Sequence, residues 1–161
     1  MPLPKYIFID IDGVLNTRNH LKQQKRETGS MSIKNWCPVA CNNLKRVCKK
    51  YEAKLVVTSS WRHEYTQEEL REIFSSNGID GGLIVDATPS YVEVPVGKEY
   101  LRGYEIKYWL ENYATDEHRY VIIDDELNIL SEQEDNFVNV SDQDGFANLM
   151  ALSRCIEILS G

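Results

Sequence analysis

Two carboxylates separated by one residue follow an apolar run near the start of the chain. Asp10 and Asp12 come after Tyr-Ile-Phe-Ile, and Gly13 allows a tight turn behind them. The apolar run is β-branched or aromatic, which is typical of a strand buried on both faces of a parallel sheet. In such sheets ligands bind at the carboxyl ends of the strands. Two like charges held together there favour a bridging cation such as Mg²⁺.

Two later apolar runs also end in oxygen-bearing side chains. One precedes Thr58 and Ser59, and the other precedes Asp124 and Asp125. A single Asp-x-Asp-Gly is often no more than the end of a strand, and its glycine comes too early for an EF-hand calcium loop. Three strands that all end in oxygen ligands, in this order, are harder to obtain by chance.

In these three segments the chain resembles the haloacid dehalogenase (HAD) superfamily of phosphohydrolases. The resemblance assigns an ordered motif to each segment: a nucleophile motif with Asp10, Asp12 and Gly13, a phosphate-binding hydroxyl motif with Thr58 and Ser59, and an acidic metal motif with Asp124 and Asp125. It implies an α/β fold, namely a HAD-like Rossmannoid three-layer sandwich around a central, mainly parallel sheet.

The superfamily also has a basic residue at the start of a helix. Arg102 begins the segment Arg-Gly-Tyr-Glu-Ile-Lys-Tyr-Trp-Leu and is our choice for this role, although lysine is usual there. Lys98 and Lys107 remain alternatives. Lys107 is also a candidate for binding the substrate.

The resemblance implies a Mg²⁺-dependent phosphatase with an aspartyl-phosphate intermediate. Asp10 attacks phosphorus, which splits one difficult step into two. Asp12 protonates the leaving oxygen and then activates water. Mg²⁺ is expected on Asp10, on the backbone carbonyl of Asp12, and on the pair Asp124 and Asp125, with Asp125 preferred as the direct ligand. Either hydroxyl of the second motif can bind the phosphoryl group, and that choice stays open.

Three further polar or aromatic residues follow the hydroxyl motif directly. Arg62 is expected to clamp a phosphate with two N–H groups. Trp61 is expected to stack on a base, and packing against the neighbouring segment 16–36 is the alternative. His63 is interpreted as a polar surface residue.

Residues 16–36 are polar and mostly lack apolar residues at regular spacing, and we predict a surface flap or insertion there. Many members of the superfamily insert a cap domain at this point, but this segment is too short to fold as one. The resemblance therefore implies an open site. Such a site admits the end of a nucleic acid or a protein side chain.

The charge of the chain is unevenly distributed. The net charge is −7, yet residues 16–54 contain ten Lys or Arg against only Glu27 and Glu52. A basic segment beside the nucleophile loop is expected to attract a polyanion and guide it into the site. A solvated helix face is the alternative.

The remaining pattern predicts one domain over residues 1–161. Helices are expected over residues 38–52, 66–76, 103–113 and 146–159, and strands over 6–9, 54–58, 83–85, 119–124 and 137–140. Asp142 or Asp144 is expected to cap the last helix.

The four cysteines indicate no metal site and no disulfide. Cys37, Cys41 and Cys48 lie at helical spacing without a nearby histidine, so reduced core thiols are expected. No apolar run approaches the ~20 residues that span a membrane. With no room for a signal peptide before the first strand, a cytoplasmic location is predicted. The oligomeric state stays open.

A finer resemblance is to the HAD domains of nucleic-acid end-repair proteins, including the 3′-phosphatase of polynucleotide kinases. It rests on the hydroxyl motif continuing into Arg62, on the Arg102 helix, and on the basic first third of the chain. A nucleic-acid end (3′) phosphatase is therefore the leading hypothesis. A phosphotyrosine or phosphoserine protein phosphatase and a nucleotidase are alternatives. A non-catalytic binding module disagrees with the presence of both Asp10 and Asp12.

Overall fold

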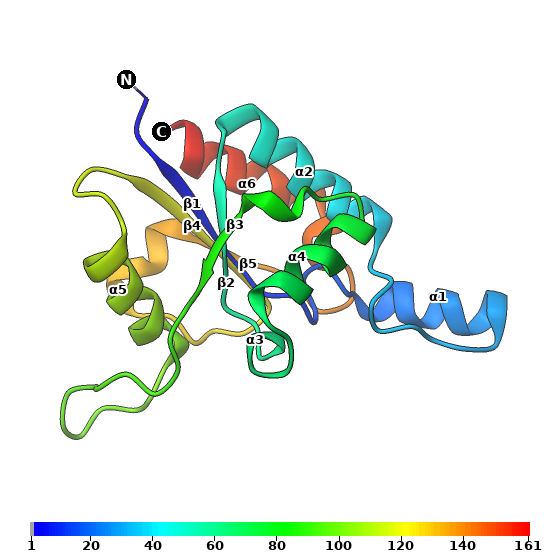
Figure 1. Cartoon of the computed structure of the whole chain (residues 1–161), viewed down its shortest axis with the longest axis horizontal. Coiled ribbons are helices and arrows are strands. Elements are labelled where there is room, and N and C mark those ends of the chain that lie inside the picture. Colours follow the sequence, from blue (N-terminus) through cyan, green and yellow to red (C-terminus); the bar gives the residue numbers. More distant parts are fainter. Residues whose placement is uncertain (1) are drawn as a thin grey trace.

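A five-stranded parallel sheet forms the centre of the computed structural model, which describes residues 2–161 (Figure 1). Its spatial order is β3-β2-β1-β4-β5, and the strands are β1 (Lys5–Ile9), β2 (Lys54–Val57), β3 (Ile84–Ala87), β4 (Arg119–Asp124) and β5 (Phe137–Asn139). Every pair of neighbouring strands is parallel. The sheet confirms the α/β prediction.

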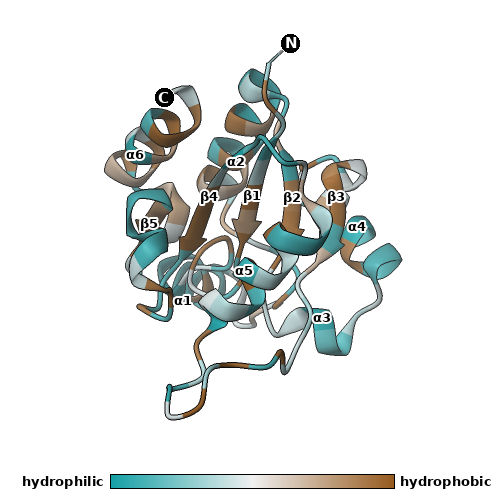
Figure 2. Cartoon of the chain, turned by 90° about the vertical axis from the view of Figure 1, so that its left-hand side faces the viewer, coloured by the Kyte–Doolittle hydropathy of each residue, from teal (hydrophilic) through white to brown (hydrophobic). Residues whose placement is uncertain are grey.

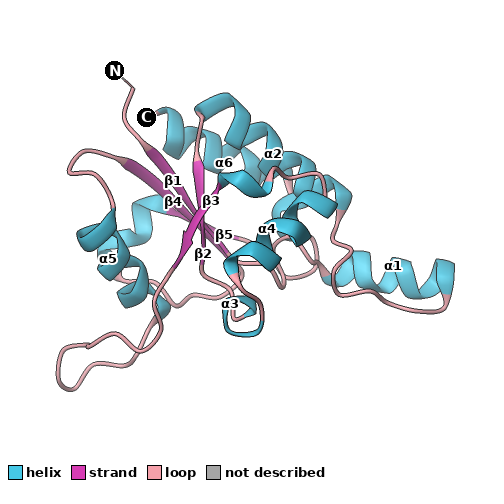
Figure 3. Ribbon diagram, in the orientation of Figure 1, coloured by secondary structure: helices cyan, strands magenta, loops and turns pink. Residues whose placement is uncertain are grey.

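Helices cover both faces of the sheet (Figure 3). One face packs against α2 (Pro38–Tyr51), α4 (Gln67–Ser76) and α6 (Leu149–Ser160), and the other against α5 (Arg102–Tyr113). Successive side chains of a strand point to opposite faces, so Ile7 and Ile9 join the first core cluster while Tyr6 and Phe8 join the second. Figure 2 shows the strands as a hydrophobic layer between helices. These three layers explain why the strand sequences are apolar throughout.

β1 lies at the point where the winding of the sheet reverses. From β1 the chain proceeds to β2 and β3 on one side, and later to β4 and β5 on the other. Loops that leave neighbouring strands in opposite directions open a crevice at their carboxyl ends. The acidic motifs after β1 and β4 both lie at this crevice.

The segment 16–36 contains a helix that was not predicted, because its sequence lacks apolar residues at helical spacing. Helix α1 (Arg18–Thr28) buries none of its residues and projects from the body of the molecule in Figure 1. Its start is capped by Thr17, whose hydroxyl accepts the N–H of His20. Gly29 ends it in the left-handed conformation, with φ 77°. Capping, rather than an apolar stripe, defines this helix.

The other predicted helices and strands are present within three residues of their expected bounds, and the largest difference is at the start of the last helix. Helix α6 begins at Leu149, and the side chain of Asn148 caps it by accepting two backbone N–H groups. The predicted caps, Asp142 and Asp144, are therefore wrong. Their carboxylates bind side chains at the start of α1 instead.

The four cysteines are free thiols. Burial raises the pKa of Cys41, Cys48 and Cys155 to about 12, so these thiols are inert core residues. Among residues 2–161, no helix combines the length and the apolar character needed to cross a membrane.

Candidate active site

Three carboxylates converge where β1 and β4 end. Asp10, Asp124 and Asp125 each offer an oxygen, and these atoms all lie within 4.8 Å of one another. Ile9 pairs with Ile123 in the sheet, so the two strands deliver their acidic residues at the same level. Asp10 and Asp124 are buried. The sheet register thus creates a compact acidic centre.

The proximity and burial of these groups change their acidity. Burial, followed by the charge of Asp124, raises the pKa of Asp10 well above its usual range, although Arg102 opposes this shift. Burial, followed by a hydrogen bond and the charge of Asp124, raises the pKa of Asp125 to about 6. Such a set of crowded oxygen donors suits a hard cation, and Mg²⁺ is the one that commonly uses one or two carboxylates beside a phosphate.

Gly13 allows the loop after β1 to turn tightly against the acidic centre. Its φ is 80°, and a Cβ atom at this position would collide with the carboxylate of Asp125. The carbonyl oxygen of Ile11 closes the turn by accepting the N–H groups of Leu15 and Asn16, both at 2.9 Å. Any residue larger than glycine would therefore displace either the loop or Asp125.

Asp12 has a separate environment from the three clustered carboxylates. The indole Nε1–H of Trp61 donates to Asp12 Oδ2 over 3.0 Å, and the amide nitrogen of Asn16 lies 3.5 Å from Oδ1. The side chain is otherwise exposed at the cavity. Each carboxylate oxygen of Asp12 thus has a protein donor, at the edge of an open cavity.

Arg102 is the basic residue that the structure brings to the acidic centre. Its Nη1 lies 2.9 Å from Asp124 Oδ2 and 3.5 Å from Asp10 Oδ2. Its Nε and Nη2 groups make no hydrogen bond to any of residues 2–161. Lys107 instead pairs with a surface carboxylate at 3.3 Å, and Lys98 is exposed in the segment before α5.

The hydroxyl motif provides three adjacent hydroxyl groups in different environments. Thr58 Oγ1 is buried and has no hydrogen-bond partner within residues 2–161. Ser59 Oγ accepts the backbone N–H of Trp61 over 3.2 Å. Ser60, which the sequence reasoning did not select, lines the cavity. The run of three hydroxyls in the sequence was the available signal for Ser60.

Arg62 does not point into the cavity with free donors, and its predicted role as a phosphate clamp is wrong. Its side chain is only 7% exposed and pairs with Glu105 at 2.9 Å. All five guanidinium N–H groups have protein acceptors, which also include the carbonyl oxygens of Thr58, Ser59 and Thr88 and the hydroxyl of Ser90. Arg62 therefore holds the hydroxyl motif against α5 and the loop after β3.

Trp61 is buried, which contradicts the prediction that it stacks on a base. It is 5% exposed, and its ring packs edge-on against Trp36 with centroids 5.6 Å apart. Trp36 ends the segment 16–36, so the alternative, packing against that segment, is confirmed. Its indole N–H adds the contact to Asp12 described above.

An open cavity of about 410 Å³ lies beside the acidic centre, and of the predicted site residues Asp10, Asp12, Gly13, Arg102 and Asp125 line it. Its lining includes residues that the sequence reasoning did not assign to the site, and these are Asn16, Leu21, Ser60, Glu126 and Asp142. Ser60 and Glu126 immediately follow a motif, so adjacency in the chain was a usable signal for these two. Asp142 comes from the loop after β5, and only the folded sheet brings it to the site.

Residues 6–150 match the family described as the HAD domain in Swiss Army Knife RNA repair proteins. The chain belongs to this HAD family. Comparison with curated proteins and with solved structures finds no significant match. Membership confirms the resemblance inferred from the ordered motifs, and it agrees with the parallel sheet and the acidic centre. It supports a phosphatase-type hydrolase in general terms.

Proposed function

We propose that this HAD domain is a Mg²⁺-dependent phosphomonoesterase that removes phosphate from nucleic-acid ends, in particular 3′ ends. The observation that carries the proposal is the convergence of Asp10, Asp124, Asp125 and Arg102, of which all but the buried Asp124 line one open cavity. The family description, which concerns RNA repair proteins, supports a nucleic acid as the substrate.

The first chemical step is assigned to Asp10 and Asp12. An oxygen of Asp10 attacks phosphorus, the bond from phosphorus to the leaving oxygen breaks, and Asp12 gives its proton to that oxygen. In the second step water attacks the aspartyl-phosphate, Asp12 takes the proton of the water, and Asp10 is released. Each step returns the carboxylates to the state that the next one needs.

A phosphate monoester repels a carboxylate nucleophile, so charge must be offset at the site. Arg102 supplies fixed positive charge beside Asp10. Bound Mg²⁺, held by Asp10, Asp125 and the backbone carbonyl of Asp12 with Asp124 alongside, would neutralise charge and polarise phosphoryl oxygens. The free hydroxyl of Thr58 and the hydroxyl of Ser60 are the proposed donors to the phosphoryl group.

Trp61 is assigned as a positioning residue for Asp12. Its N–H fixes one oxygen of this carboxylate, and the ring is immobilised by packing against Trp36 and Tyr65. The second oxygen of Asp12 lies 3.5 Å from the amide nitrogen of Asn16, which lines the cavity, and this oxygen is assigned the proton transfer to the leaving group. Trp61 does not touch the substrate in this assignment.

The primary test uses a generic aryl phosphate with the purified protein. Hydrolysis is expected with Mg²⁺, and it is expected to stop when the metal is chelated or when Asp10 is replaced by Asn. An inactive wild-type protein, or an Asp10→Asn variant with undiminished turnover, would sink the proposal.

The substrate class is tested with a panel at matched concentrations. It contains 3′- and 5′-phosphorylated oligoribonucleotides, phosphotyrosine and phosphoserine peptides, and nucleoside monophosphates. We expect the highest kcat/KM for the 3′-phosphorylated RNA. A preference for phosphopeptides would support the protein-phosphatase alternative, and a preference for mononucleotides would support a nucleotidase.

A further inference from the structure

Helix α1 is fixed to the edge of the active-site cavity. The backbone N–H groups of Arg18 and Asn19 donate to the carbonyl oxygens of Asp142 and Gln143, over 3.0 and 3.1 Å. The Arg18 guanidinium also pairs with the Asp142 carboxylate at 2.8 Å. Arg18 and Leu21 themselves line the cavity. The first turn of α1 is therefore part of the rim of the site.

The helix continues outward with positive charge on one face. Lys22, Lys25 and Arg26 are spaced i, i+3 and i+4, and together they line a shallow hollow on the surface. None of these three side chains forms a salt bridge within residues 2–161. From Arg18 to Arg26 the rise of an α-helix corresponds to about 12 Å. A row of uncompensated positive charge thus leads away from the cavity.

The chain keeps this exposed helix in place with polar contacts rather than with a core. An isolated helix of 11 residues is marginally stable in water, and α1 buries no side chain. The return segment supports it, because Gln24 donates to the carbonyl oxygen of Asn35 and accepts the N–H of Ser32. His20 contacts the same carbonyl over 3.0 Å. These contacts hold a charged surface in a defined place.

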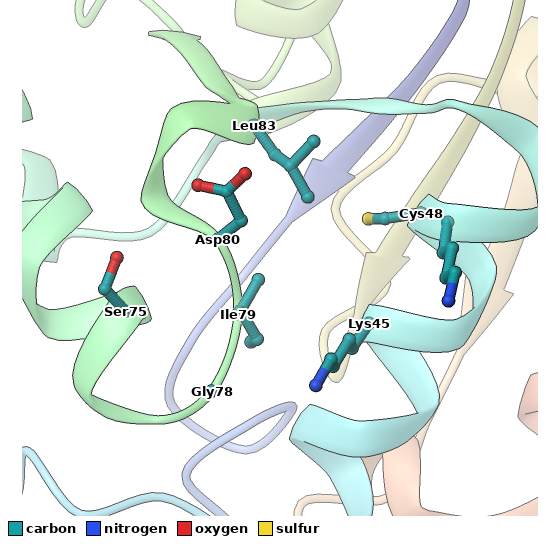
Figure 4. A pocket seen from close by; sticks show the side chains of 8 residues that line it. Lys45, Cys48, Ser75, Gly78, Ile79, Asp80 and Leu83 are labelled. Carbon is teal, nitrogen blue, oxygen red and sulfur yellow. The ribbon is translucent and has the colours of Figure 1, made fainter.

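The other part of the basic segment is located differently. Helix α2 exposes Lys45, Arg46, Lys49 and Lys50, and a hollow of about 490 Å³ lies beside it (Figure 4). This hollow is lined by residues of α2 and of the segment around Gly78–Leu83, none of which lines the catalytic cavity. The two helices carry comparable charge, but only α1 is continuous with the site.

We propose that α1 is the strand-binding surface of this domain. The phosphates of a single-stranded RNA lie along Arg18, Lys22, Lys25 and Arg26, while its phosphorylated end occupies the cavity. This inference rests on the proposed function, because it assumes that the cavity receives an RNA end. It assigns to α1 the place that a cap would take in a capped relative.

The test measures binding without turnover. A fluorescent 3′-phosphorylated oligoribonucleotide is titrated with an Asp10→Asn protein, and anisotropy gives Kd over a series of salt concentrations. Each phosphate contact on a single strand contributes ~0.7 to the slope of log K against log salt. The triple variant Lys22→Ala, Lys25→Ala, Arg26→Ala is expected to reduce this slope by ~2 and to weaken binding at least ~10-fold at low salt.

The matched control is the triple variant Lys45→Ala, Arg46→Ala, Lys49→Ala on α2. It removes the same charge, and its slope and Kd should equal those of the parent. Alanine has the highest helix propensity, so both helices should persist, as circular dichroism can verify. An unchanged slope in the α1 variant, or equal losses in both variants, would overturn the proposal.

The outcome is separable from that of the proposed function. If the wild-type protein hydrolyses no phosphate ester while the α1 variant loses RNA binding, the enzyme proposal is refuted and the proposal that α1 binds RNA is supported. If hydrolysis of RNA 3′-phosphate is confirmed while the α1 variant binds RNA like its parent, the surface fails alone.

Discussion

Arg62 and Arg102 lie in the same part of the molecule and have opposite relations to the cavity. Arg62 directs every guanidinium N–H at a protein acceptor and pairs with the buried Glu105. Arg102 uses a single nitrogen for the acidic centre and lines the cavity. The sequence suggested a phosphate clamp for Arg62 and the superfamily's basic residue for Arg102.

The difference is a matter of counting donors. A guanidinium can bind phosphate only with N–H groups that the protein has not already engaged. Arg62 therefore holds the backbone of the hydroxyl motif in place outside the cavity. Arg102 supplies positive charge inside the cavity. Stability measurements and activity measurements should separate these two roles.

The largest expected effect is on stability, from Arg62→Met. It leaves the Glu105 carboxylate buried without its cation, which typically costs ~3–5 kcal/mol. Urea unfolding measures the loss. The double variant Arg62→Met, Glu105→Gln should recover part of it, because the uncompensated charge is gone. If Arg62→Met is as stable as the wild type, the hydrogen bonds and ion pair of Arg62 contribute little to stability.

Arg102→Ala should have the reverse signature. Removing a charged group that faces the developing phosphoryl charge is expected to lower kcat/KM by ~10²–10³. With saturating Mg²⁺ the midpoint of unfolding should change less than in Arg62→Met, because the bound cation then offsets the charge of Asp10 and Asp124 that Arg102 no longer balances. Lys107→Ala is the control, and its activity should match the wild type. Equal activity losses in the two variants would refute the choice of Arg102.

Trp61→Phe tests the positioning of Asp12 and should have a smaller effect. Loss of the indole N–H is expected to lower kcat by ~10-fold, on the scale of one hydrogen bond to a charged group. The loss should be greater for an ester with a poor leaving group than for an acidic aryl phosphate, with KM little changed. Trp36→Phe is the control in the same aromatic cluster, because its indole binds the carbonyl oxygen of Ile33. Identical losses in both variants would reduce Trp61 to a packing residue.

The smallest expected effect concerns the acidic centre without substrate. Because the pKa of Asp125 is raised to about 6 in the folded protein, the folded state binds a proton more tightly than the unfolded state. In the metal-free protein, protonated Asp125 therefore contributes to the free energy of unfolding at low pH, and this contribution is lost as the pH rises through about 6. Mg²⁺ at ten times its Kd should add ~1.4 kcal/mol at neutral pH. This corresponds to ~3–6 °C in Tm, and the gain should shrink at pH 5.

Much of this architecture was readable in the sequence because apolar runs that end in carboxylates indicate buried parallel strands. The positions of Asp10, Asp124 and Asp125 followed from that pattern together with the HAD resemblance. Helix α1 was not predicted because it buries no side chain and its sequence therefore has no regularly spaced apolar residues. Its caps, Thr17 and Gly29, were the only local signals.

The roles of Arg62 and Trp61 could not be read from the sequence because they depend on groups far along the chain. Glu105 is 43 positions away from Arg62, and Asp12 is 49 positions away from Trp61. Neither spacing corresponds to a helix or strand period. Only the packing of the loops at the carboxyl edge brings these partners together.

The most direct test of the central claim is chemical trapping at Asp10. The wild-type protein is mixed with Mg²⁺ and its best phosphorylated substrate, quenched during turnover, and reduced with borohydride, which converts an aspartyl-phosphate to homoserine. Peptide mass spectrometry then locates the modified residue. Our account predicts homoserine at position 10, dependent on substrate and Mg²⁺. Reduction at Asp12 or Asp125 instead, or no reduced carboxylate during demonstrable turnover, would contradict it.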